Sequence, residues 1–166
     1  MFSTLQLPRV SLRLLNHKDG HSLWSILSDR RVGEFNDYDL RLSRSDVKQM
    51  IQDDISGFYE QKVVRLAIIE STTNAFIGSV GIYDINGDSA WLGFELAPHY
   101  WQCGYMFEIL ELLITKRMLE TGFPDFTHQI QTFQANVSPH NIACIKLLSK
   151  LGFELKENTV WMRTII

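Results

Sequence analysis

Residues 92–106, LGFELAPHYWQCGYM, decide the fold, because they join a buried strand to an amphipathic helix through a short turn. Pro98 ends the strand, since proline has no N–H to donate to a neighbouring strand. Gly104 begins a helix that we expect to extend to Thr121, with apolar residues on one face. The free N–H groups of its first turn and the positive end of its dipole can bind an anion without a lysine. One glycine at such a junction is a weak indication by itself, so an anion site and a purely structural turn are equally supported at this point.

Three antiparallel strands are predicted over residues 63–97, and the last of them is the strand that ends at Pro98. Residues 63–69, 75–85 and 89–97 are rich in β-branched and aromatic side chains. Asn86-Gly87 predicts a two-residue type I′ turn between the last two strands, since that turn needs a positive φ at both central positions. The three strands therefore form consecutive hairpins that end at Pro98.

The rest of the chain predicts further strands and helices on either side of these hairpins. A strand over 10–15 is followed by a helix with apolar residues at 23–27, and a second helix begins at the capping pair Ser43 and Asp46. After Gly122 and Pro124 end the long helix, we expect a strand over 129–136, a helix capped by Ser138, a Schellman stop at Gly152-Phe153, and a hairpin over 154–165. This order of elements predicts an α/β (α+β) fold.

The composition is that of one globular domain spanning residues 1–166. Hydrophobic residues make up 45% of the chain and charged residues 21%, and a chain of this size buries about 70% of its surface on folding. The formal net charge of −3 provides no basic field for nucleic acid or an anionic membrane. Neither a signal peptide nor a membrane-spanning apolar run is present, so we expect a cytoplasmic protein. Cys103 and Cys144 have the spacing of neither a disulfide framework nor a zinc site, so we expect reduced thiols and no metal.

Two separated motifs resemble those of the GNAT superfamily of N-acetyltransferases, and within it the RimJ/RimL-like branch. The family's turn pattern, Arg/Gln-x-x-Gly-x-Gly/Ala, falls on residues 101–106, where only Gly104 fits strictly, but Pro-x-Tyr-Trp-x-x-Gly-Tyr is similar to this branch. Gln102 stands where the branch usually has glycine. The second motif, an Asn followed by Ser or Ala and then by Leu-Gly-Phe, falls on Asn141, Cys144 and residues 151–153. Two motifs in the correct order are more specific than either alone.

The resemblance implies a mixed, largely antiparallel twisted sheet of six to seven strands, flanked by about four helices, with two splayed strands forming an acetyl-CoA cleft. Acetyl-CoA, the implied co-substrate, would lie between the strand ending at Pro98 and the strand ending near residue 136. The implied cofactor-binding residues are Phe94, Glu95, Leu96, Gln102, Cys103, Gly104, Tyr105, Met106, Asn136 and Asn141. For Asn141 the alternative is a helix-capping role, which its expected place inside the first turn of the helix begun at Ser138 disfavours.

The implied reaction is direct transfer, in which a neutral primary amine attacks the thioester and coenzyme A leaves as a thiolate. Many superfamily members have a tyrosine general acid seven residues after the motif Asn, and that position is Leu148 here. Water or another side chain could protonate the thiolate; Ser138 and Cys144 are the candidates, although a helix cap and a core thiol explain them better. The general acid therefore stays open.

Glu95 is the preferred general base, because it lies in the strand expected to flank the thioester. The alternative for Glu95 is an edge carboxylate that faces solvent. His140 is a poorer candidate, since an exposed place in the first helical turn explains a polar residue there. Cys103 is not needed as a nucleophile, because direct transfer has no acyl-enzyme.

An acidic and aromatic segment over residues 34–39 predicts part of the amine-binding wall. Glu34 and Asp37 could attract a cationic amine, and Phe35 and Tyr38 could give it an apolar face. A solvated loop with its aromatic side chains in the core explains the same pattern.

Together these inferences favour an N-acetyltransferase for protein N-terminal α-amines, acting as a monomer or a homodimer. An α-amine costs about 1 kcal/mol to deprotonate at pH 7, whereas a lysine-like amine costs about 4.6 kcal/mol, so an N-terminal substrate depends less on a base. The alternatives are a small-molecule acetyltransferase for a polyamine or an aminoglycoside, and an acyl-CoA-binding module without catalysis.

Overall fold

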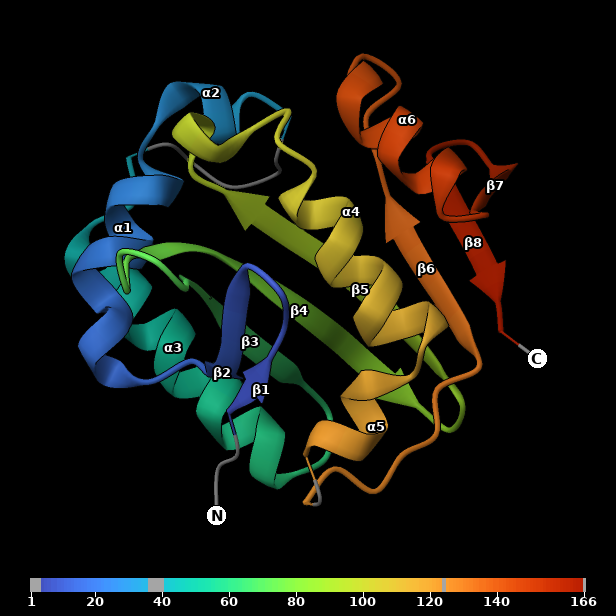
Figure 1. Cartoon of the computed structure of the whole chain (residues 1–166), viewed down its shortest axis with the longest axis horizontal. Helices are drawn as coiled ribbons and strands as arrows, with labels where there is room; N and C mark the ends of the chain where they lie inside the picture. The colour runs from blue at the N-terminus through green and yellow to red at the C-terminus, as the bar shows by residue number, and fades with distance from the viewer. Residues whose placement is uncertain (1–3, 36–40, 124, 166) are drawn as a thin grey trace.

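The computed structural model describes residues 4–35, 41–123 and 125–165, and the strands in these ranges form one sheet (Figure 1). The strand order is β1-β2-β3-β4-β5-β6-β8-β7. The strands are β1 Leu5–Gln6, β2 Val10–Leu14, β3 Val64–Glu70, β4 Phe76–Asn86, β5 Ser89–Leu96, β6 Thr132–Asn136, β7 Glu154–Glu157 and β8 Val160–Thr164. Neighbouring strands are antiparallel except β5 and β6, which are parallel. This is the mixed, largely antiparallel sheet that the resemblance implied.

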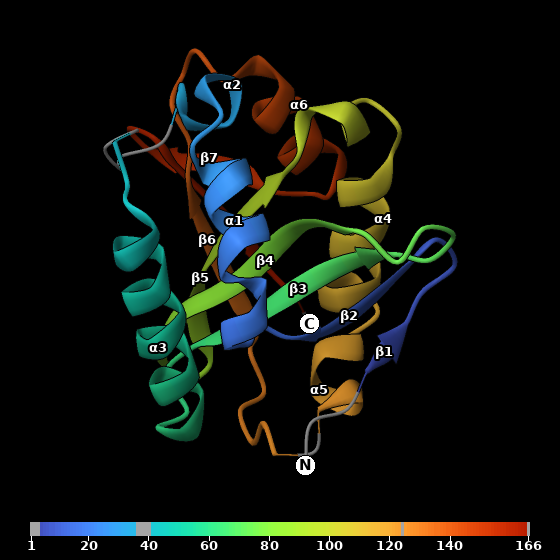
Figure 2. The ribbon, with the colours of Figure 1, turned by 90° about the vertical axis from the view of Figure 1, so that its left-hand side faces the viewer.

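Helices cover both faces of the sheet. The α-helices are α1 Gly20–Leu27, α2 Arg30–Gly33, α3 Arg44–Tyr59, α4 Tyr105–Leu110, α5 Met118–Gly122 and α6 Ile142–Lys150. Shorter helical turns are η1 His17–Asp19 and η2 Pro98–Tyr100, both 3-10, and the π-helical η3 Glu111–Thr115. Figure 2 shows α1 and α3 on one side of the sheet and α4 and α5 on the other.

The core is divided into two clusters because successive side chains of a strand point to opposite faces. In β3, Ala67 and Ile69 pack in a small cluster with side chains of α1 and α3. Leu66 and Ile68 of the same strand lie in the larger cluster, which includes side chains of α4, η3, α5 and α6. The helices are therefore attached to a sheet that is apolar on both faces.

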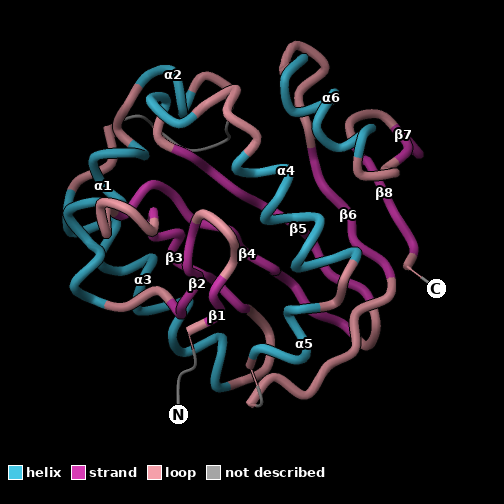
Figure 3. The backbone as a smooth tube through the Cα atoms, viewed as in Figure 1, coloured by secondary structure: helices cyan, strands magenta, loops and turns pink. Residues whose placement is uncertain are grey.

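The parallel pair β5 and β6 separates along its length. The register joins Ser89–Trp91 to Thr132–Gln134, and residues 92–96 of β5 continue only along β4. The backbone trace in Figure 3 shows the two strands diverging toward their C-terminal ends. The sheet therefore contains the splayed strands that the resemblance implied.

The described residues contain eight strands rather than six or seven, and six α-helices rather than about four. β1 is only two residues long, which is too short to show an alternating pattern in the sequence. α2 has four residues, and α5 results from a break in a helix that the sequence predicts to be continuous.

That break corrects the prediction of one helix over 104–121. After α4 the chain widens into the π-helical η3, and Arg117 then takes a left-handed φ of 56° before α5 begins. The Arg117 side chain donates to Glu120 at 3.3 Å and to the carbonyl of Ile165 at 3.2 Å, which holds the break in place. Buried leucines continue on both sides of the break, so the periodicity of apolar residues could not reveal it.

The hairpin between β4 and β5 turns one residue later than predicted. Asn86 pairs with Ser89, so Gly87 and Asp88 form the two-residue loop, and of these only Gly87 has a positive φ, at 63°. This is the pattern of a type II′ turn rather than type I′. A bulge between Tyr83 and Asn86 gives β4 one residue more than β5 over this stretch, which shifts the turn.

The structure confirms two predicted helix-end motifs, the capping box of α3 and the Schellman motif of α6. Ser43 accepts from the N–H of Asp46 at 3.0 Å and Asp46 accepts from the N–H of Ser43 at 2.8 Å, which is the capping box expected for α3. At the end of α6 the N–H of Phe153 donates to Leu148 at 2.9 Å and that of Gly152 to Ser149 at 3.0 Å, as in a Schellman motif. These signals are local, so the sequence alone could locate them.

Candidate active site

The splayed part of β5 leaves backbone groups directed away from β4. The N–H of Ala97 donates to Ile77 at 2.8 Å, and groups that bond to one neighbour alternate along a strand. The N–H and C=O of Phe94 and Leu96 therefore point to the side where β6 has separated, whereas those of Glu95 point toward β4. Of these groups the Leu96 carbonyl accepts the indole N–H of Trp101 at 2.6 Å.

The turn that follows β5 contains two left-handed residues, Gln102 with φ 58° and Gly104 with φ 81°. Gln102 thus adopts a left-handed conformation that suits glycine, at the position where the branch usually has glycine. The turn is fixed by the bond from Trp101 to Leu96 and by the Cys103 thiol, which donates to the carbonyl of Trp101 at 3.2 Å. Of the remaining residues expected here, Tyr105 is half-buried and Met106 is buried in the core.

Glu95 lies in a polar cluster on the face of the sheet that α1 and α3 cover. Its Oε1 accepts from Arg65 Nη2 and from Ser79 Oγ, both at 2.5 Å, and its side chain is 13% exposed. Arg65 also donates to Asp54 of α3 at 3.0 Å and to Ser79 at 3.2 Å. The alternative of a solvent-facing edge carboxylate is therefore wrong, whereas the role of Glu95 as a base stays a prediction.

Burial sets the protonation states around this cluster. Burial alone would lower the pKa of Arg65, but the neighbouring carboxylates of Glu95 and Asp54 outweigh it and raise that pKa, so the guanidinium stays charged. Burial also raises the pKa of Asp54, an effect that the contact with Arg65 opposes. The phenol of Tyr83, which packs against Gly81 and Gly93, has its pKa raised by burial and stays protonated.

The sequence did not predict that Arg65, Asp54 and Tyr83 surround Glu95 on this face of the sheet. A usable signal existed for Arg65, because one arginine interrupts the apolar run over 63–69, and a buried charge requires a partner. No pattern in the sequence identifies which carboxylates supply it.

Asn141 is the N-cap of α6, which corrects two expectations. Its Oδ1 accepts from the N–H of Cys144 at 3.2 Å, so the helix begins after Asn141 and not at Ser138. Ser138 instead accepts from the N–H of His140 at 3.3 Å, in a turn closed by the bond from Asn141 N–H to the Ser138 carbonyl. The premise that disfavoured capping is therefore wrong. Within the described residues the side-chain NH₂ of Asn141 has no protein acceptor, and its role as a cofactor ligand stays a prediction.

The candidate general acids differ in accessibility. Leu148, at the position of the usual tyrosine, is fully buried in the core. Burial raises the pKa of the Cys144 thiol to about 11. Proton transfer from such a thiol to a departing thiolate of pKa near 8.5 is uphill by roughly 3 kcal/mol, which argues against Cys144 as the acid. Ser138 is half-buried and His140 is exposed.

The other residues predicted for the site are Asn136 and the acidic and aromatic segment over 34–39. Asn136, at the end of β6, is exposed and accepts from Thr159 Oγ1 at 2.5 Å. Glu34 is exposed and Phe35 is half-buried after α2, whereas Asp37 and Tyr38 lie outside the described residues. The acceptor wall therefore stays a prediction.

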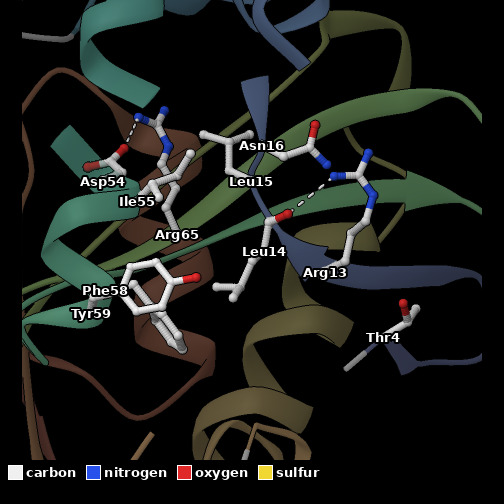
Figure 4. Close-up of a pocket in the computed structure, with 10 residues that line it drawn as sticks. All are labelled: Thr4, Arg13, Leu14, Leu15, Asn16, Asp54, Ile55, Phe58, Tyr59 and Arg65. Atoms are coloured by element: carbon white, nitrogen blue, oxygen red, sulfur yellow. Dashed lines mark hydrogen bonds and ion pairs between the residues drawn. The ribbon is translucent and has the colours of Figure 1, made fainter. Parts of the chain in front are cut away.

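A separate cavity of about 220 Å³ lies between β2 and α3. Arg65 and Asp54 line it, whereas Glu95 does not. Figure 4 shows the Asp54–Arg65 ion pair at one side of it and Arg13 at the other, with Leu14 and Ile55 between them. None of the residues predicted for the site lines this cavity, so it is not the splayed cleft.

Among the described residues, no three side chains of His, Cys, Asp or Glu come together as a metal site would require. None of the described helices has the length and apolar character needed to cross a membrane.

Comparisons with known proteins agree with this geometry. Residues 9–154 match the family model described as an acetyltransferase (GNAT) domain. An uncharacterized N-acetyltransferase p20 of Bacillus licheniformis is 29% identical over 155 residues, covering 91% of this chain and 82% of that protein.

Solved structures show the same fold at low sequence identity. RimL, a ribosomal L7/L12 alpha-N-protein acetyltransferase in complex with coenzyme A, has a TM-score of 0.81 at 16% identity, covering 98% of both chains. Mycobacterium smegmatis RimJ with CoA-disulfide has a TM-score of 0.77 at 17% identity, covering 98% of this chain and 86% of that one. Because the family model matches most of the residues, this chain belongs to the GNAT acetyltransferase family and is an N-acetyltransferase.

Proposed function

We propose that residues 1–166 form one acetyltransferase domain that transfers acetyl from acetyl-CoA to the N-terminal α-amine of a protein. The splay between β5 and β6 carries this proposal, because Phe94 and Leu96 direct backbone groups into it beside the left-handed turn at Gly104. Backbone N–H and C=O groups of this kind fit the amide-containing arm of coenzyme A. The free N–H groups after the turn fit its phosphates.

Each residue of the site has a separate role in this proposal. The thioester is supplied by acetyl-CoA as co-substrate. A backbone N–H of the splayed strand stabilises the oxyanion, and Glu95 accepts a proton from the attacking amine directly or through one water. Arg65 and Ser79 hold Oε1 of Glu95, so the second oxygen is the one available to accept that proton.

Two arguments support an α-amine as the acceptor. Two solved structures with this fold are named as acetyltransferases of ribosomal-protein N-termini, one from Salmonella typhimurium. The chemistry also suits a site with few acid–base groups, because an α-amine is substantially neutral near pH 7.8 without help.

One observation favours a small-molecule acceptor as the second candidate. The Microcin C7 self-immunity acetyltransferase MccE, in complex with acetyl-CoA and AMP, matches this fold with a TM-score of 0.77. The same fold therefore also occurs in an acetyltransferase whose structure contains a nucleotide besides acetyl-CoA.

Cofactor binding and acceptor choice are tested in two steps. Coenzyme A at 100 times its Kd should stabilise the protein by about 2.7 kcal/mol, which raises Tm by about 5–11 °C for a chain of this size. An unchanged Tm at millimolar coenzyme A contradicts the proposal. Turnover is then measured with free N-terminal peptides, polyamines and aminoglycosides. The same peptides with blocked N-termini and an internal lysine serve as controls and should not react.

A further inference from the structure

We propose that Arg9 is a cofactor-binding residue, which orders the turn over residues 101–104 and supplies the cation for the phosphates of coenzyme A. Arg9 lies between β1 and β2, far from the turn in sequence. This inference rests on the proposed function, because it requires coenzyme A to bind at that turn.

Three contacts join Arg9 to the turn and to α4. Its Nη1 donates to the carbonyl of Cys103 at 2.9 Å, and its Nε donates to Oε2 of Glu108 at 2.9 Å. The guanidinium also lies 4.1 Å from the centre of the Tyr105 ring. One side chain thus contacts both the end of the turn and the first turn of α4, which limits their relative movement.

The remaining nitrogen of Arg9 is placed beside Gly104. A side chain at Gly104 would bring its first carbon to 3.4 Å from Nη2, so this nitrogen lies next to the left-handed glycine. Within the described residues Nη2 has no protein acceptor, and the side chain is 41% exposed. The Nη2 group can therefore donate to an anion held by the backbone at this turn.

The turn itself lacks a cationic side chain. From Pro98 to Phe107 the sequence contains neither lysine nor arginine, and Glu108 adds a negative charge in the first turn of α4. An unpaired carboxylate there would repel a phosphate, and Arg9 neutralises it. The guanidinium has five N–H groups, so pairing with Glu108 and Cys103 does not exhaust its donors.

The test compares Arg9→Met with Arg31→Met by calorimetric titration. Arg31 is a matched control, because it also pairs with a carboxylate, Asp29, on an exposed part of α2. Two probes are used, coenzyme A and S-acetylpantetheine, which keeps the thioester and the arm but has no phosphate. Arg9→Met should raise the Kd for coenzyme A by about 10- to 100-fold, the range expected for losing one charge-assisted hydrogen bond. The Kd for S-acetylpantetheine should change by less than about twofold, and Arg9→Lys should restore part of the affinity for coenzyme A.

A second variant separates phosphate binding from a purely structural role. Glu108→Gln keeps an acceptor for Arg9 Nε but removes the negative charge, so it should bind coenzyme A at least as tightly as the original protein. If Arg9 only orders the turn, both probes lose affinity equally in Arg9→Met, and the inference is overturned. It is also overturned if Arg9→Met and Arg31→Met bind coenzyme A alike. Absence of coenzyme A binding in the unaltered protein would instead reject the proposed function itself.

Discussion

Replacing Glu95 by glutamine tests whether the buried carboxylate of β5 acts as the general base. Glutamine keeps the shape and an acceptor oxygen for Arg65 and Ser79, but it cannot take a proton from the amine. If Glu95 is the base, kcat should fall by ~10² to 10⁴ while the Kd for coenzyme A stays nearly unchanged, because the backbone of Glu95 points toward β4.

The same substitution has a cost in stability that the structure allows us to estimate. Oε1 of Glu95 accepts two hydrogen bonds of 2.5 Å, both made to a charged oxygen. Converting a charge-assisted hydrogen bond to a neutral one loses about 1 kcal/mol, so the free energy of unfolding should fall by about 2 kcal/mol. For a chain of this size that lowers Tm by about 4–8 °C, and the folded protein remains available for kinetics.

Asp54→Asn is the matched control, because Asp54 is the other carboxylate bound to Arg65, at 3.0 Å. It removes one charge-assisted bond from the same guanidinium and should lower stability by about 1 kcal/mol. Asp54 lies on α3, on the far side of Arg65 from β5. Asp54→Asn should therefore keep kcat within about threefold of the original value.

The assay is steady-state acetyl transfer from pH 6 to pH 9 with the best acceptor of the panel. For an α-amine acceptor, raising the pH toward 9 should recover much of the rate lost in Glu95→Gln, since the neutral amine then becomes abundant. A lysine-like acceptor would recover far less. Equal losses of kcat in Glu95→Gln and Asp54→Asn, or an unchanged kcat in Glu95→Gln, would refute the role of Glu95 as base.

Three further predictions concern the turn and the buried thiol. Gly104→Val should weaken coenzyme A binding more than folding, because its side chain meets Arg9 beside the proposed phosphate site; equal losses in titration and urea unfolding would count against this. Gln102→Gly should raise the free energy of unfolding by about 0.5–1 kcal/mol, since it relieves a left-handed residue, and denaturant unfolding that shows a decrease would contradict it. At pH 8 the Cys144 thiol, with its pKa near 11, is about 0.1% ionised. Iodoacetamide should therefore modify the exposed Cys103 first, and mass spectrometry showing equal rates would argue against this burial.

The parts of the fold that the sequence could predict depend on short-range patterns. The capping box at Ser43 and Asp46 and the stop at Gly152-Phe153 involve residues three to five positions apart, so their chemistry is visible in the sequence. The three consecutive strands before Pro98 were predicted from their β-branched and aromatic residues and from the turn signal at Asn86-Gly87. The splay between β5 and β6 followed only from the family resemblance, since no local pattern indicates where two strands separate.

The parts that could not be predicted depend on contacts between distant segments. The break after η3 is held by Arg117 and the carbonyl of Ile165, 48 positions away. The environment of Glu95 requires Arg65 from β3 and Asp54 from α3. The start of α6 at Asn141 rather than Ser138 is a different error, because both residues are good caps and the turn between them decided which one is used.

The turn after β5 departs from the family pattern at Gln102, and contacts from inside and outside the motif hold its conformation. Gln102 accepts a left-handed conformation, at a cost of about 1–2 kcal/mol that glycine would avoid. Trp101 and Arg9 fix the turn from its two ends, through the Leu96 and Cys103 carbonyls. A contiguous motif therefore describes this site incompletely, because Arg9, 94 positions before Cys103, reaches the turn only in the folded chain.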